Sequence, residues 1–209
     1  MHRLQCLVSW CCFLFLVMGL YLQHNVGLAD NGDFSRAMTL FTSGPVGIEP
    51  NWPDPNLEPE AWHNRFFTYW LPAWKLDSPG QVLFRSTALL LWIPGVLLNY
   101  LFLSRRTLYL QSLGLVPKVL LCVYLAAALR VVRDRVRDQT AQTVSMAVVG
   151  VLLSLMFVAT DYVAYQQSFY FEGASFVYLI GLLLSFVAFR GDSRRRLAVG
   201  LLFTLLLAG

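Results

Sequence analysis

Two carboxylates follow the first long apolar segment of the chain. Asp30 and Asp33 lie in the sequence Asp-Asn-Gly-Asp-Phe-Ser-Arg, which ends at Arg36. A carboxylate at a membrane surface can act as a general base or hold a cation, and an arginine can pair with a phosphate. Asn-Gly-Asp is also a turn sequence, and an aspartate often caps a helix. We interpret Asp30 as the turn or cap residue and Asp33 as the main catalytic candidate.

A second polar group lies later in the sequence, between two apolar segments. Asp161 ends the first of these segments, Glu172 begins the second, and Gln167 and Tyr170 lie between them. Ionisable residues at membrane depth are costly, and they indicate function by default. The structural alternatives are that Asp161 ends a span at the interface and that Glu172 is favoured by the dipole at a helix start.

The composition places the chain in a membrane. It is 57% hydrophobic and 13% charged, with a mean hydropathy of +0.57, whereas a soluble domain is about 25% charged. Seven of the twelve acidic residues lie between residues 23 and 80. Most basic residues form short clusters at 105–106, 130–137 and 190–196. Basic clusters beside apolar spans mark cytoplasmic loops, so we expect no nucleic-acid partner.

Six apolar segments are candidates for membrane helices, which need about 20 residues to cross; they are 4–22, 87–104, 113–129, 142–160, 173–189 and 196 onward. We predict an all-α polytopic bundle of about five or six spans or embedded segments. Residues 1–22 form its signal anchor, with a cleaved signal peptide as the alternative. Residues 23–80 form one large extracytoplasmic loop, and 81–209 form the transmembrane region. Residue 209 is interpreted either as the natural C-terminus or as the point at which a longer sequence is truncated.

Charge also predicts how the segments are oriented. If 87–104 and 113–129 both crossed, the basic residues of 130–137 would lie outside, against the positive-inside rule. Pro94 and Gly95 interrupt the first of these segments. We therefore predict that 81–112 is a partly embedded outer element, and that 113–131 runs inward. The following pair, 142–160 and 173–189, then forms a hairpin whose tip faces the same side as Asp33.

Aromatic residues in the loop predict one short helix. From 60 to 74 they recur close to helical spacing. This segment is interpreted either as an amphipathic helix on the outer leaflet or as a helix packed against the bundle. The four cysteines and three histidines have neither disulfide nor zinc-ligand spacing. No metal site is assigned.

The order of these features resembles the polytopic GT-C glycosyltransferases and, among them, the bacterial glycan-biosynthesis hexose transferases. The resemblance depends on residues 31–36 (Asn-Gly-Asp-Phe-Ser-Arg) and 167–172 (Gln-Ser-Phe-Tyr-Phe-Glu). In such relatives we expect an Asn-Ser-Phe-Tyr-x-Glu motif, where this chain begins with Gln167.

The resemblance implies that a hexose moves, with inversion, from a polyprenyl-phosphate donor to a lipid-linked or cell-surface glycan at the bacterial inner membrane. Asp33 would take the proton of the acceptor hydroxyl, and Arg36 or Arg85 would bind the departing lipid phosphate. The remaining candidates would bind the sugar; they are Gln167, Tyr170, Glu172 and Asp161. No cofactor is assigned, although a divalent cation between Asp33 and Glu172 is one option. The expected partners are the sugar donor, the acceptor and membrane lipids.

Two non-enzymatic interpretations compete with glycosyl transfer. In one, the chain is a polytopic subunit or transporter fragment in which Asp33, Asp161 and Glu172 line a polar path or hold helices together. In the other, it is a plain membrane anchor for a partner enzyme. The acidic and aromatic loop favours the enzyme, and the short chain favours its competitors.

Overall fold

The computed structural model describes residues 2–22, 40–45, 73–77, 86–159, 163–165 and 171–208. The chain divides into two compact units. Unit 1 comprises residues 1–23, 118–163 and 175–209, and unit 2 comprises residues 24–117 and 164–174. The described residues are mostly helical, as predicted.

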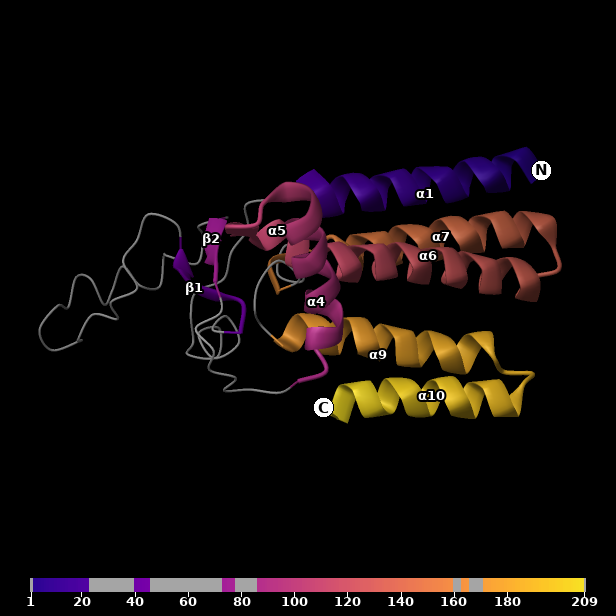
Figure 1. Cartoon of the computed structure of the whole chain (residues 1–209). Helices are drawn as coiled ribbons and strands as arrows, with labels where there is room; N and C mark the ends of the chain where they lie inside the picture. Colours follow the sequence, from indigo (N-terminus) through magenta and orange to yellow (C-terminus); the bar gives the residue numbers. More distant parts are fainter. Residues whose placement is uncertain are drawn as a thin grey trace, which may run out of the picture. The chain divides into compact units, whose positions relative to one another are not determined.

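Five apolar helices make up most of the described part of unit 1 (Figure 1), and they are α1 (His2–Leu22), α6 (Leu115–Arg135), α7 (Gln139–Phe157), α9 (Phe171–Ala188) and α10 (Ser193–Ala208). The first residues of α6 and α9, 115–117 and 171–174, belong to unit 2. The bounds of the five helices agree with the predicted segments to within six residues, and the largest difference is at the end of α6, which is at 135 instead of 129. Three helical stretches in the described part are long and apolar enough to cross a membrane, namely Arg3–Leu22, Leu110–Arg135 and Gln139–Phe157. Glu172–Ala188 and Leu89–Leu103 are shorter apolar helices. The total number of spans stays a prediction.

Two aspartates explain where helices begin after the short turns. Asp138 caps α7, because its Oδ2 accepts a hydrogen bond from the Ala141 amide at 2.6 Å. Asp192 plays the same part before α10, where its Oδ1 accepts from the Arg195 amide at 3.0 Å. A carboxylate in this position satisfies an amide that has no partner within the helix.

Helix α1 packs along α7, which runs in the same direction. Contacts link the two helices at successive levels: Gln5 with Gln142, Cys12 with Ser154, and Gly19 with Val158. The close approach depends on glycines. A Cβ added at Gly150 would lie 2.5 Å from the Cys12 sulfur, and one added at Gly19 would lie 2.9 Å from the Val158 Cβ. Small residues allow membrane helices to approach in this way.

Contacts also give the directions of the other helices of unit 1, which alternate when the five helices are taken in chain order. Helix α6 runs against α1, since Lys118 lies beside Tyr21. Helix α9 runs with α6, because Arg135 donates to the carbonyl of Val187 at 3.0 Å and a Cβ at Gly181 would lie 2.6 Å from the Tyr124 hydroxyl. Helix α10 returns along α9, with Phe203 against Gly181.

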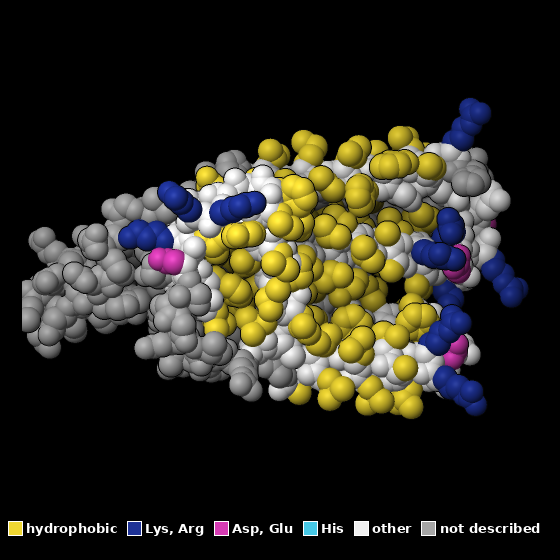
Figure 2. All heavy atoms as spheres, viewed as in Figure 1, with side chains coloured by type: hydrophobic (Ala, Val, Ile, Leu, Met, Phe, Trp, Pro, Cys, Tyr) yellow, Lys and Arg dark blue, Asp and Glu magenta, His cyan; other side chains and the backbone are white. Residues whose placement is uncertain are grey.

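This arrangement gathers arginine at one end of unit 1. The start of α1, both ends of the α6–α7 turn and both ends of the α9–α10 turn carry nine arginines and three aspartates. Figure 2 shows these basic side chains at the end of the helices, beyond a broad apolar surface. The end of α1 and the starts of α6 and α9 lie at the opposite end. We call this the acidic-motif end, because the motif at 31–36 follows α1 in the sequence and the motif at 167–172 leads into α9.

Unit 2 contains a small sheet, so the prediction of an all-α chain was wrong here. The antiparallel strands are ordered β1-β2-β3 and comprise Thr42–Pro45, Ala73–Leu76 and Thr107–Tyr109. Trp74 pairs with Leu108 in register, and both side chains are buried. Trp74 is thus in a strand, not at the end of the predicted 60–74 helix; the rest of that segment, before residue 73, lies outside the described residues.

The described part of the segment 81–112, predicted to be partly embedded, begins with an interrupted helix. Helix α4 (Leu89–Leu98) continues through Pro94 and Gly95, passes into the π-helix η2 (Asn99–Leu103), and ends where Ser104 becomes extended. The interruption therefore lies later than the Pro-Gly pair suggested. Gly95 has another role, because a Cβ there would meet the Ser112 carbonyl in the short helix α5 (Leu110–Leu113).

Asn99 organises the end of this interrupted helix. Its side chain is fully buried, and its Nδ2 donates to the carbonyls of Ser104 at 3.1 Å and Thr107 at 2.8 Å. Its Oδ1 accepts from the Tyr109 amide at 3.0 Å and from the Ser112 hydroxyl at 3.4 Å. One amide side chain therefore pairs with backbone groups of Ser104, just after η2, and of Thr107 and Tyr109 in β3, which irregular backbone would otherwise leave unpaired.

Candidate functional site

Most residues predicted to carry chemistry cannot be placed. The described part of the chain does not include Asp30, Asp33, Arg36, Arg85, Asp161, Gln167 or Tyr170. The structure therefore does not test whether these side chains meet, and their roles stay predictions.

Glu172 is the one predicted site residue that the structure describes. It is exposed and lies in the first turn of α9. Val187, which contacts Arg135 at the arginine end, is fifteen residues further along the same helix. At 1.5 Å per residue, this separation is about 22 Å. Glu172 therefore lies at the acidic-motif end, where the helix dipole also favours a carboxylate.

A buried cation that is not among the residues predicted from the sequence lies at that end. Lys118 in α6 is 2% exposed, and its Nζ lies 5.0 Å from the centre of the Tyr21 ring. Among the described residues, none of the carboxylates forms an ion pair with it. It also lies in the first turn of α6, where the dipole disfavours a positive charge. The sequence held a signal, since Lys118 is the single charged residue of the apolar segment 113–129.

A lysine in this setting is suited to an anion. The cation–π contact with Tyr21 contributes on the order of 1 kcal/mol, which is less than the several kcal/mol that desolvating an ion costs. A phosphate or carboxylate from a ligand would supply a negative charge, which none of the described carboxylates supplies. Lysine binds phosphate as a point charge and needs no bidentate geometry.

The arginine end contains a different kind of site, a pocket between α1 and α6. Its volume is about 370 Å³, and it is lined mainly by apolar side chains such as Trp10, Phe13, Leu125 and Leu129. Arg130 and Arg133, one turn apart on α6, add positive charge to the lining. Gln5 and Ser9 of α1 supply further polar groups.

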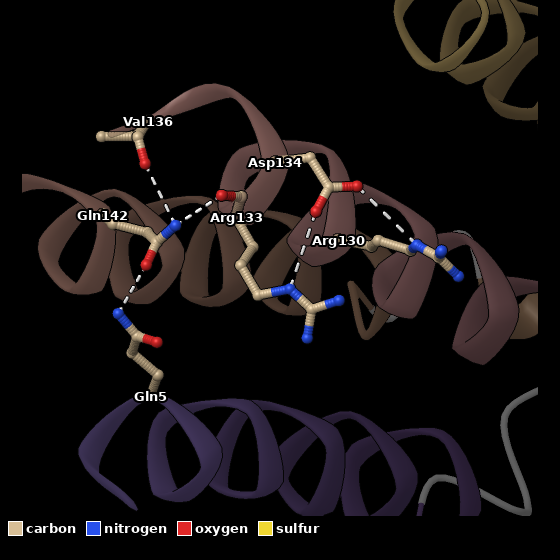
Figure 3. Close-up of polar contacts among 6 residues, drawn as sticks. All are labelled: Gln5, Arg130, Arg133, Asp134, Val136 and Gln142. Carbon is tan, nitrogen blue, oxygen red and sulfur yellow. Dashed lines mark hydrogen bonds and ion pairs between the residues drawn. The ribbon is translucent and has the colours of Figure 1, made fainter. Parts of the chain in front are cut away.

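Polar contacts fix the helices around this pocket (Figure 3). Gln5 Nε2 donates to Gln142 Oε1 at 2.6 Å, and Gln142 Nε2 donates to the carbonyls of Arg133 and of Val136, the latter at 3.0 Å. Gln142 therefore joins α1, α7 and the end of α6. Asp134 lies between the two arginines, 3.8 Å from Arg130 Nε and 3.7 Å from Arg133 Nε.

Metal binding has no support from the described residues, which contain no group of three His, Cys, Asp or Glu side chains that could hold an ion. The optional cation between Asp33 and Glu172 is not tested, because Asp33 lies outside the described part.

Comparison with known proteins gives one match. The family described as the YfdI N-terminal transmembrane domain matches residues 2–209. Neither the curated proteins nor the solved structures contain a match to the chain. The match covers nearly the whole sequence and supports membrane integration, which the composition predicted.

Proposed function

This chain belongs to the YfdI N-terminal transmembrane domain family, and from that premise we propose that it acts as a membrane glycosyltransferase. In this proposal a hexose moves, with inversion, from a polyprenyl-phosphate donor to a lipid-linked or cell-surface glycan. The site lies at the acidic-motif end, on the extracytoplasmic face of the bacterial inner membrane. The observation that carries the proposal is Lys118, a buried ammonium beside Tyr21 with no carboxylate partner among the described residues.

The position of Lys118 suits a lipid-linked donor. It is in the first turn of α6 and is the ninth residue of the apolar stretch Leu110–Arg135, and it lies beside Tyr21 near the end of α1. A polyprenyl phosphate carries a compact negative charge on a hydrocarbon chain that lies in the bilayer. We propose that Lys118 binds the donor phosphate and balances the charge that develops on it as the sugar leaves. Arg36 and Arg85 remain the candidates from the sequence for the same task.

The sugar-binding and base roles come from the two sequence motifs. Asp33 would accept the proton of the acceptor hydroxyl, with Asp30 beside it. Gln167, Tyr170, Glu172 and Asp161 would hold the sugars. Positive-inside orientation of the nine arginines would put the motifs at 31–36 and 167–172 outside.

Hexose transfer by the full-length protein in lipid nanodiscs, with a radiolabelled polyprenyl-phosphate hexose, tests the proposal. Asp33→Asn should lower kcat at least 100-fold, because a general base contributes that much. Lys118→Met should raise the KM for the donor at least tenfold. The matched controls are Asp54→Asn in the same acidic loop and Lys75→Met, the other lysine of the chain.

Two results would contradict the proposal. One is that the wild-type protein transfers no sugar while Asp33→Asn leaves the cellular glycan unchanged, which favours the non-catalytic subunit, transporter or anchor. The other is that Lys118→Met and Lys75→Met change the KM equally, which removes the phosphate-binding role of Lys118.

A further inference from the structure

We infer that the pocket between α1 and α6 at the arginine end binds an anionic phospholipid. The inference is independent of the proposed function, because it concerns the opposite end of unit 1. The pocket holds about 370 Å³, within the size range of specific small-molecule sites. Its lining is largely apolar, as an acyl chain requires, and its charged residues are both arginines.

The charges around the pocket select an anion. Asp134 lies beside both arginines, and its carboxylate is 3.8 Å from Arg130 Nε and 3.7 Å from Arg133 Nε. Both arginine side chains are more than half exposed. A guanidinium binds a phosphate with paired hydrogen bonds. One aspartate between two arginines leaves the lining with a net positive charge.

The pocket also joins polar and apolar surfaces at the right place. Arg130 and Arg133 lie in the last two turns of α6, where a membrane helix meets the headgroup level. From there, Leu129 and Leu125 continue along α6 toward the membrane interior, facing Trp10 and Phe13 of α1. A lipid with its phosphate on the arginines would place its acyl chain between these residues. Basic pockets between membrane helices bind phospholipid headgroups in this way.

Other sources of negative charge fit less well. Inorganic phosphate would leave the apolar part of the pocket unfilled, and phosphatidylcholine would add a positive charge beside the arginines. We therefore commit to a phospholipid with a net negative headgroup, for which phosphatidylglycerol is the probe.

Binding is measured on the full-length protein in dodecyl maltoside, by native mass spectrometry with phosphatidylglycerol or phosphatidylcholine. The double variant Arg130→Gln/Arg133→Gln should weaken phosphatidylglycerol binding at least tenfold and leave phosphatidylcholine binding unchanged. Asp134→Asn should strengthen phosphatidylglycerol binding two- to threefold. The matched control, Arg137→Gln/Arg194→Gln, removes two exposed arginines from the same end that do not line the pocket, and it should change binding less than twofold.

A second measurement reports where the lipid lies. Brominated phosphatidylglycerol should quench tryptophan fluorescence in the wild-type protein, and Trp10→Phe should remove most of that quenching. Ala126→Phe keeps the charges but fills the pocket, because Ala126 is part of the lining; it should reduce binding at least fivefold. This variant preserves the test if the double arginine variant does not fold.

Three results would overturn the inference. The first is equal loss of binding in the two double arginine variants, which indicates a diffuse charge effect. The second is equal affinity for the two phospholipids. The third is full competition by inorganic phosphate at the concentration of the lipid, which indicates an anion site without a lipid chain.

Discussion

The interactions that stabilise the interior of unit 1 differ from those that stabilise the interior of unit 2. In unit 1, helices approach closely at glycines such as Gly150 and Gly19, and apolar side chains cover the outer surface. In unit 2, the interrupted helix, the third strand and α5 are joined by the four hydrogen bonds of Asn99. The difference follows from the backbone. Continuous helices satisfy their own amides, whereas an irregular segment in an apolar setting needs a side chain to do so.

This difference between the units predicts which substitutions each of them tolerates. Between membrane helices there is no hydrophobic driving force, so shape complementarity decides the packing. Unit 1 should therefore be sensitive to volume, and unit 2 to the loss of one polar group. Three substitutions test that contrast.

Asn99→Leu should have the largest effect. It leaves the carbonyls of Ser104 and Thr107 and the Tyr109 amide without a partner, and each buried unpaired group costs about 1–3 kcal/mol. We expect a loss of about 4 kcal/mol in the stability of unit 2. Maleimide labelling of a Leu108→Cys variant, whose site is fully buried in unit 2, should accelerate with Asn99→Leu.

The control for this experiment is Tyr100→Leu, at the next and exposed position of η2. It should leave the labelling at position 108 unchanged. Cys12, which is buried in unit 1, should stay protected in both variants. If Cys12 becomes reactive together with position 108, the two units do not unfold separately, and the contrast between them is wrong.

Gly150→Leu should have the next largest effect, and it should act on unit 1. The first carbon of the new side chain would lie 2.5 Å from the Cys12 sulfur and 3.4 Å from Leu129 Cδ2. Forcing α1 away from α7 should cost about 2–3 kcal/mol. Faster labelling of Cys12, located by mass spectrometry, is the expected result. Gly191→Leu is the control, because a Cβ at Gly191 meets nothing within 4 Å.

Gln142→Leu should have the smallest effect of the three, although it removes a polar hub in unit 1. Gln142 bonds to Gln5 at 2.6 Å and to the last carbonyls of α6, but this end of the bundle is partly exposed, so water can replace these bonds. We expect a loss of about 1 kcal/mol, measured by thermal unfolding in micelles beside the exposed control Gln139→Leu. A loss equal to that of Asn99→Leu would remove the distinction between the units.

The helices of unit 1 could be predicted from the sequence because hydropathy along the chain determines them. The predicted segments 113–131 and 142–160 correspond to Leu115–Arg135 and Gln139–Phe157, and the shifts at the start of α7 follow from the cap at Asp138. Unit 2 could not be predicted in the same way. Its sheet joins residues 42, 74 and 108, and no local pattern records pairing over such distances.

The candidate site shows the same limit. Asp33 and Glu172 can be recognised in the sequence because each is a carboxylate beside an apolar segment. Lys118 is the single charge of the segment 113–129, but the sequence does not show whether that charge is buried or exposed. Its burial and its position over Tyr21 depend on how α1 packs against α6, which is a property of the fold.

The pairing of α1 with α7 also orders events during synthesis. Gln5 and its hydrogen-bond partner are 137 residues apart, and Cys12 and Ser154 are 142 apart. At a translation rate of 5–20 residues per second, on the order of ten seconds passes between the emergence of the two helices. During that interval the first helix resides in the bilayer without its parallel neighbour. Helix α7 is made only after the α6–α7 turn, so α1 and α7 can pair only after both helices have been inserted.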